Sequence, residues 1–269
     1  MRIYTSIASF VNTIDACPEG EAAVSMSGVL FPFKYKIKKG SKSFVVFTPG
    51  AFEKKDSWIR FQRSSYFASI DASCISFFDP TLFLSSDNSF KIGWFQGGQG
   101  SYIDFLICCF DEIKKAWGGS HENILFYASS AGGLPAVNLA AKCKGSKVFC
   151  SNIQTNIFKW GHLHINNILN YCYNGFSRDY VEKNFDKTNI YSIDEEFDLF
   201  LVQNLCDHFH YQEHYLPYVE KMFSKINLKT ITYSCPDSGH NPLSFDKEIA
   251  TINSILNGGD PFISYIDLV

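Results

Sequence analysis

A serine between two small residues is the feature of the chain with the most direct chemical meaning. The segment 126–133 reads FYASSAGG and joins an apolar run to a run predicted to be helical. A nucleophilic serine on a sharp strand-to-helix turn has a strained backbone and needs small residues two positions before and after it. Ala128 and Gly132 occupy these two positions around Ser130. If Ser129 were the nucleophile, the bulky Tyr127 would stand two positions before it. The pattern predicts Ser130 as a nucleophile, although Ala128 replaces the usual glycine; a small-residue turn that only packs closely is the alternative.

A nucleophilic serine needs a base, and the base needs an acid that orients it. His240 lies in the turn-rich segment 235–242, CPDSGHNP, directly after the last predicted strand, and is the predicted base. Asp207 follows the strand predicted at 197–202 and a short loop, and is the predicted acid. An exposed loop histidine and a helix N-cap are the plainer roles for these two residues. Asp237 is a rival acid, but its place in the loop of the base favours a turn-forming role.

The oxyanion of an acyl-transfer intermediate needs backbone N–H donors. One donor is expected from the residue after the nucleophile, Ala131, and a second from the loop after an early strand. The strand predicted at 43–47 is followed by a Pro-Gly turn. Because Pro49 has no N–H, Gly50 or Ala51 is the expected second donor. An ordinary turn is the alternative.

The segment 207–210, DHFH, with His214 nearby, contains residue types that bind zinc or iron. In an extended segment, however, His208 and His210 would point to one side and Asp207 to the other. We therefore expect no metal here, and expect one of these histidines to line a substrate pocket.

The segment 94–100, WFQGGQG, is rich in glycine and precedes a predicted helix. It lacks the Lys-Ser/Thr end of a phosphate loop and the spacing of a dinucleotide site. We interpret it as a mobile loop over the active site. Trp94 and Trp160 are candidates for stacking on a sugar ring, with core packing as the alternative.

Short apolar runs alternate with helical segments along the chain. Strands are predicted at 29–37, 43–47, 72–78, 123–127, 147–150, 197–202 and 228–233, and helices at 102–117, 134–141, 211–223 and 247–256, with helical or irregular structure over 158–186. This alternation predicts an α/β fold, a mostly parallel sheet with helices on both faces, in a single domain spanning 1–269. The candidate residues follow predicted strands, at the carboxyl ends where such sheets hold their sites. Pro135 implies that its helix either starts near Gly132 or is kinked.

Composition narrows the class of protein. The 269 residues are 46% hydrophobic with a formal net charge of -3. The chain therefore lacks the surplus of basic residues that would predict binding to nucleic acid or to an anionic membrane. No apolar run has the roughly 18 residues of a membrane span. Residues 1–10 alternate apolar and polar side chains, which predicts an edge strand rather than a signal peptide. The 9 cysteines, an odd number without C-x-x-C, favour reduced thiols and a cytoplasmic protein.

Ser130, Asp207 and His240, in that order along the chain, resemble the α/β-hydrolase superfamily over about residues 43–257. A narrower resemblance rests on short motifs. The chain looks like bacterial hydrolase-fold proteins associated with capsule and other surface-polysaccharide biosynthesis, in the motifs ASSAGG (128–133), QTNIF (154–158) and QNLCDHFH (203–210).

The resemblance implies acyl transfer by the same three residues. The first hypothesis is an esterase that needs no cofactor and acts on an O-acyl (acetyl) group of a glycan or a small ester. The second is an O-acetyltransferase of a capsular or surface polysaccharide with acetyl-CoA as donor; the basic run 34–42 and the pair Lys54-Lys55 are candidates for binding its phosphates, with a solvated face as the alternative. The third is a non-catalytic binding module on a hydrolase fold. The sequence does not predict the oligomeric state.

Overall fold

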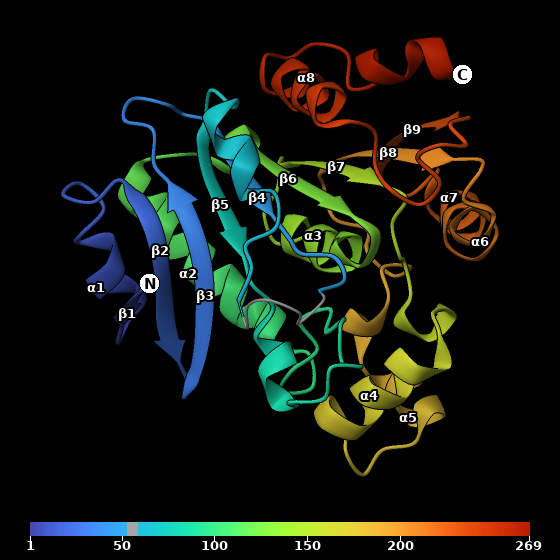
Figure 1. The fold of residues 1–269 in the computed structure, drawn as a ribbon, viewed down its shortest axis with the longest axis horizontal. Coiled ribbons are helices and arrows are strands. Elements are labelled where there is room, and N and C mark those ends of the chain that lie inside the picture. Colours follow the sequence, from blue (N-terminus) through green and yellow to red (C-terminus); the bar gives the residue numbers. More distant parts are fainter. Residues whose placement is uncertain (53–58) are drawn as a thin grey trace.

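The computed structural model describes residues 1–52 and 59–269. In these ranges one sheet of nine strands, in the order β1-β2-β3-β5-β4-β6-β7-β8-β9, extends through the molecule (Figure 1). The strands are β1 (Arg2–Tyr4), β2 (Glu19–Met26), β3 (Val29–Lys36), β4 (Phe44–Phe47), β5 (Ser73–Phe77), β6 (Ile124–Ser129), β7 (Lys147–Ser151), β8 (Asp198–Asn204) and β9 (Asn227–Tyr233). β3 pairs antiparallel with β2 and β5, and the remaining pairs are parallel. The predicted mostly parallel sheet is confirmed.

Two apolar clusters lie on opposite faces of this sheet. Along β4, Phe44 and Val46 belong to one cluster, and Val45 and Phe47 to the other, as the alternation of strand side chains requires. The helices are α1 (Ile7–Val11), α2 (Ser101–Trp117), α3 (Gly133–Ala140), α4 (His162–Cys172), α5 (Arg178–Asn184), α6 (His208–His210), α7 (Leu216–Met222) and α8 (Phe245–Leu256). The first cluster includes residues of α1, α2, α3, α4 and α7, and the second includes residues of α8 and of the short helix η1 (Ser64–Ala68). Helices therefore cover both faces, as predicted.

The structure differs from the predicted elements at a few points. The alternating segment at the N-terminus forms the edge strand β1 for only three residues and then turns into α1. β2 was not predicted, because its first three residues, EGE, have no apolar side chain and are exposed or half-buried. The segment predicted as a helix at 211–223 consists of a π-helical turn at Tyr211–Tyr215 followed by α7, and α6 lies directly before it. Pro217 lies in α7 just after the residues of this π-helical turn, so its missing N–H interrupts an α-helical pattern that would otherwise continue through it.

Pro135 is the third residue of α3. It therefore lies in the first turn, where a backbone N–H has no partner within the helix and a proline is tolerated. Of the two alternatives, the helix that starts near Gly132 is the one observed.

All nine cysteines are free thiols, and most of them are buried. Among the described residues, no helix combines the length and the apolar character that a membrane span needs.

Candidate active site

Ser130 lies on a strained turn between β6 and α3. Its φ of 53° falls in the left-handed region, which a residue with a side chain rarely adopts. Gly132 has little room on its other side: a Cβ there would lie 2.6 Å from the carbonyl oxygen of Thr48 and 3.1 Å from that of Pro49. Ala128, in contrast, is completely buried in the first of the two apolar clusters, the one that also contains Phe44 and Val46, where its methyl group is accommodated. The loop that follows β4 thus requires a small residue at position 132, two residues after the serine.

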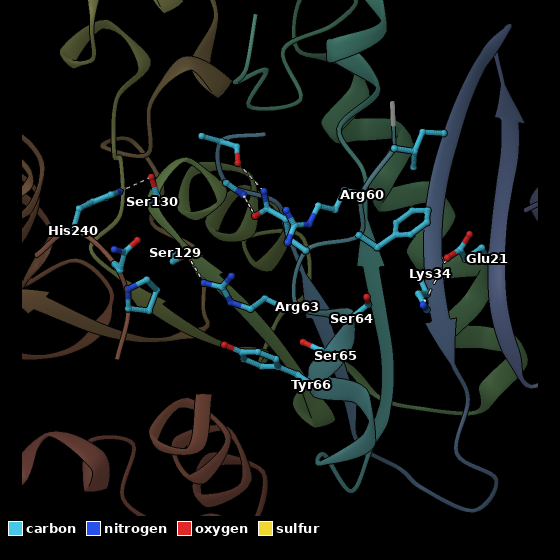
Figure 2. Close-up of a pocket in the computed structure, with 17 residues that line it drawn as sticks. Glu21, Lys34, Arg60, Arg63, Ser64, Ser65, Tyr66, Ser129, Ser130 and His240 are labelled. Atoms are coloured by element: carbon cyan, nitrogen blue, oxygen red, sulfur yellow. Dashed lines mark hydrogen bonds and ion pairs between the residues drawn. The ribbon is translucent and has the colours of Figure 1, made fainter. Parts of the chain in front are cut away.

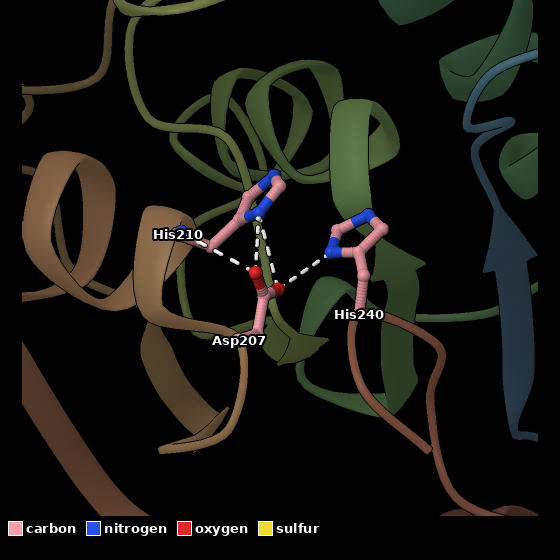
Figure 3. Close-up of side chains that lie close together, drawn as sticks. All are labelled: Asp207, His210 and His240. Carbon is pink, nitrogen blue, oxygen red and sulfur yellow. Dashed lines mark hydrogen bonds and ion pairs between the residues drawn. The ribbon is translucent and has the colours of Figure 1, made fainter. Parts of the chain in front are cut away.

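Ser130, His240 and Asp207 form a continuous chain of hydrogen bonds. Ser130 Oγ lies 2.8 Å from His240 Nε2, and His240 Nδ1 lies 2.6 Å from Asp207 Oδ2 (Figures 2 and 3). Burial raises the pKa of Asp207, but the hydrogen bonds from His210 and His240 outweigh burial and hold that pKa well below its usual range. An ionised Asp207 accepts Nδ1–H and leaves Nε2 free to accept the serine proton. Exposed Asp237 lies in the turn before His240, whereas the Nδ1 atom faces Asp207.

Two buried asparagines hold the loop that carries His240. Asn204, the last residue of β8, donates its amide to the carbonyl oxygens of Cys235 at 2.7 Å and Gly239 at 2.8 Å. Asn152 donates to the carbonyl oxygen of His240 at 3.0 Å and accepts the backbone N–H of Asn204 at 2.8 Å. The sequence did not single out either asparagine, because the carbonyl groups they bind lie far along the chain.

The three residues predicted to donate a backbone N–H to the oxyanion differ in their hydrogen bonding and exposure. Ala131 occupies the first turn after the serine, where backbone N–H groups have no partner within the helix. Gly50 lines the same cavity as Ser130, but its N–H donates to Gln62 Oε1 at 2.9 Å. Ala51 is exposed and also lines that cavity.

A cavity of about 690 Å³ opens above Ser130 and His240 (Figure 2). Its far wall contains Lys34 of β3, which forms an ion pair with Glu21 of β2 at 3.6 Å. Arg60 and Arg63, from the segment before η1, line the wall between them. Within residues 1–52 and 59–269, the cavity is thus lined by three cationic side chains, Lys34, Arg60 and Arg63, and one acidic side chain, Glu21.

Arg63 is fixed at the cavity wall by a buried cluster. Its Nη2 donates to Ser129 Oγ at 3.1 Å, and its Nε lies 3.7 Å from Glu248 Oε2. Glu248, on α8 and 1% exposed, also accepts hydrogen bonds from the hydroxyls of Tyr66 and Tyr127. Burial raises the pKa of Glu248 to about 7, although Arg63 and Tyr66 act in the opposite direction. No sequence pattern pointed to Arg63 or Glu248, which are separated by most of the chain.

The structure places the four predicted substrate-binding residues outside this cavity. Trp94 is 2% exposed and donates its indole N–H to Gln154 Oε1 at 2.8 Å, so it packs in the core. Trp160 packs against the ring of His210, and His208 is exposed on α6. His210 is buried against Asp207, on the other side of its carboxylate from His240 (Figure 3). The helical turn after Asp207, rather than an extended segment, separates His208 from His210.

The glycine-rich segment 94–100 is not a loop over the site. Residues 94–97 are buried, and the Cβ of any residue replacing Gly97 would lie 2.1 Å from the ring of Tyr102. Of the basic run 34–42, only Lys34 lines the cavity; Lys36 donates to a backbone carbonyl and Lys38 pairs with Asp71. The pair Lys54-Lys55 lies outside the described residues.

Comparison with family models and with curated protein sequences finds no match. Among solved structures, the chain is similar to the capsule O-acetyltransferase of Neisseria meningitidis serogroup A, with a TM-score of 0.61 and 16% identity over 87% of this chain and 96% of that one. A mutant of that protein has also been solved in complex with CoA. Acetyl xylan esterase 1 from Thermoanaerobacterium has a TM-score of 0.54 and 11% identity, over 90% of this chain and 84% of that one. An esterase of the bacterial hormone-sensitive lipase family has a TM-score of 0.58 and 9% identity, over 95% and 92%. These similarities, with the sheet and helices described above, establish the predicted α/β-hydrolase fold.

Proposed function

We propose that this protein is an acyl-transfer enzyme in which Ser130 is the nucleophile, His240 the general base and Asp207 the orienting acid. The observation that carries the proposal is the hydrogen-bond chain from Ser130 Oγ through His240 to Asp207, at 2.8 and 2.6 Å, which opens into a cavity. A serine next to a base that is itself oriented by a carboxylate is the arrangement of nucleophilic catalysis.

The geometry supports a two-step reaction. Ser130 Oγ attacks the acyl carbonyl carbon while His240 Nε2 takes the hydroxyl proton, and the carbonyl oxygen becomes an oxyanion held by backbone N–H groups. Ala131 supplies one N–H. Ala51 supplies the second, since the N–H of Gly50 is bonded to Gln62. The C–O bond then breaks, the alcohol leaves with the proton from His240, and water hydrolyses the acyl-serine by the same steps.

The first candidate activity is hydrolysis of an O-acyl group, such as acetyl, on a glycan or a small ester. The cavity of about 690 Å³ is in the range of small-molecule sites and has room for a sugar unit. The fold is shared with proteins named as esterases and as a capsule O-acetyltransferase.

A second candidate, transfer of acetyl from acetyl-CoA to a sugar hydroxyl of a surface polysaccharide, is favoured by a specific observation. Lys34, Arg60 and Arg63 line the cavity, and the phosphates of CoA are anions that such side chains bind. The acyl-serine would then react with the sugar hydroxyl instead of water. Whether the acyl-serine reacts with water or with the sugar hydroxyl depends on how well the bound sugar excludes water.

Labelling with a fluorophosphonate probe tests the nucleophile directly. We expect mass spectrometry to find the label on Ser130, no label in Ser130→Ala, and retained labelling in Ser129→Ala, which changes the adjacent serine. Loss of labelling in His240→Ala would show that the base activates the serine. An unlabelled wild-type protein with native circular dichroism would reject the proposal in favour of a binding module.

A direct comparison then separates the two activities. Hydrolysis of p-nitrophenyl acetate is measured beside acetyl-CoA consumption with and without an added glycan. Consumption of acetyl-CoA that needs the glycan assigns transfer, and consumption that does not need it assigns hydrolysis.

A further inference from the structure

We infer that His210 is a positioning residue of the site: it shares the carboxylate of Asp207 with His240 and stacks on the His240 ring, and so sets how strongly Asp207 supports the base. The inference rests on the proposed function. The acid of a serine triad needs only one histidine partner, so a second imidazole on the same carboxylate calls for a role of its own.

Asp207 lies between the two imidazoles. His210 Nδ1 is 3.1 Å from Asp207 Oδ1 and 3.1 Å from Oδ2, while His240 Nδ1 is 2.6 Å from Oδ2 (Figure 3). The backbone N–H of His210 also donates to Oδ1, at 3.4 Å, because Asp207 is the N-cap of α6. The helix start therefore places His210 three residues after the acid, directly against its carboxylate.

The two imidazole rings are stacked, with centroids 4.0 Å apart and planes 20° apart. His210 is 2% exposed, and its ring is enclosed by Trp160 at 5.1 Å and His214 at 5.3 Å on further sides. The titratable groups that face it are therefore Asp207, His214 and His240.

Burial lowers the pKa of His210, and the nearby His240 acts in the same direction, although the hydrogen bond to Asp207 opposes both. His210 is thus neutral at neutral pH, with its one ring proton on Nδ1, where it is donated to Asp207. A neutral donor adds no positive charge beside His240, so it does not oppose the imidazolium that forms when His240 takes the serine proton.

The shared carboxylate has a definite chemical consequence. Each N–H bond that a carboxylate accepts stabilises its charge and makes it a weaker acceptor for its other partners. Removal of the His210 donor would therefore strengthen the bond from Asp207 to protonated His240, and the base would stay protonated to a higher pH. It would also free one side of the carboxylate to rotate.

Two variants separate the contacts that His210 makes. His210→Phe keeps an aromatic ring against His240 and removes the donor, whereas His210→Gln keeps an N–H donor and removes the ring. For His210→Phe we expect the acidic limb of the kcat/KM profile for p-nitrophenyl acetate to move up by about half a pH unit or more. At neutral pH we expect kcat to fall about tenfold with KM unchanged. His210→Gln should leave the limb near its wild-type position, and His162→Phe, at an exposed histidine of α4, serves as the matched control.

A spectroscopic readout keeps this test independent of the reaction. In Ser130→Ala protein, the ¹⁵N shifts of the His240 ring are followed against pH with and without His210→Phe. A higher titration midpoint in the double variant supports the inference even if the proposed acyl transfer is rejected. An unchanged midpoint and an unmoved acidic limb overturn it, as does a lower Tm that accounts for the whole loss of activity. If His210→Phe does not fold, the wild-type spectrum decides: a neutral His210 protonated on Nδ1 supports the inference, and a charged His210 at neutral pH rejects it.

Discussion

The side-chain amide of Asn204 donates a hydrogen bond of 2.8 Å to the carbonyl oxygen of Gly239, the residue directly before His240. The end of β8 thereby fixes the position of the loop that brings the His240 imidazole to Ser130. Asn152 holds the same loop one residue later, so the position of the imidazole is determined from two neighbouring strand ends.

Removal of the Asn204 amide should loosen the base. We expect Asn204→Ala to cost about 1–3 kcal/mol of stability, because two partly buried carbonyl groups lose their donor. We expect kcat for p-nitrophenyl acetate to fall about 100-fold, because small misplacements of catalytic groups are costly. Asn184→Ala is the matched control, since its amide also donates to a backbone carbonyl, at 2.7 Å, but on exposed α5. Equal kinetics for the two variants would contradict the assigned role.

Asp207→Asn should preserve the fold and impair the support of His240. An amide in place of the carboxylate favours the wrong imidazole tautomer and removes the charge that balances the imidazolium. We expect kcat to fall about 10⁴-fold, with Tm within a few degrees of wild type. Asp237→Asn, in the loop of the base, should be nearly unaffected. Activity lost in Asp237→Asn and kept in Asp207→Asn would show that the acid is misassigned.

Gly132→Ala should disturb the turn by steric contact alone. The φ of Gly132 is -65°, which any residue adopts, but the new Cβ would lie 2.6 Å from the carbonyl oxygen of Thr48. We expect a loss of about 1–3 kcal/mol in urea unfolding. Fluorophosphonate labelling should also slow, because the displaced loop carries Gly50 and Ala51. The control is Gly161→Ala, where φ is -62° and the nearest atom to the new Cβ is 3.9 Å away; equal stability of the two variants would refute the steric argument.

His214 should make the fold sensitive to acid. Burial is the main reason that its pKa is lowered, from 6.5 to about 3. Between these values the unfolded chain binds a proton that the folded protein does not, so stability is full above pH 6.5 and is lost as the pH falls. His214→Asn keeps an acceptor for the N–H of Thr155, which His214 Nδ1 accepts at 3.2 Å, and removes the titration. We expect its unfolding free energy to fall less between pH 6.5 and 4 than that of wild type or of exposed His162→Asn. Parallel curves for all three would exclude His214 as the cause.

The fold was largely readable from the sequence because its central strands are short, mostly apolar runs. β4 and β5 are buried along their whole length, and a run of that kind has few other structures available to it. β2 was missed because its first residues are polar, and it is defined by its antiparallel partner β3 rather than by its own pattern.

The candidate nucleophile, base and acid were local predictions, each based on a few residues around one strand end. Their roles remain predictions, although the structure brings them within hydrogen-bond distance. Arg63 and Glu248 could not be predicted in this way, since the contact joins residues far apart along the chain. Of the two roles left open for Trp94, core packing is the one observed. The sequence could not choose between them, because an aromatic residue beside glycines has the same sequence appearance in the core as in a binding loop.

The cavity is lined by residues from Glu21 to Pro242, and the wall at Arg63 is braced by Glu248 on the last α-helix. This spread along the chain has a consequence for biosynthesis. A growing polypeptide that has just passed Ser130 already contains the serine proposed as nucleophile, yet it has neither His240 nor Asp207. In the proposed mechanism, reactivity of the serine therefore arises late in translation, once β9 has paired with β8 and the loop that bears His240 has docked.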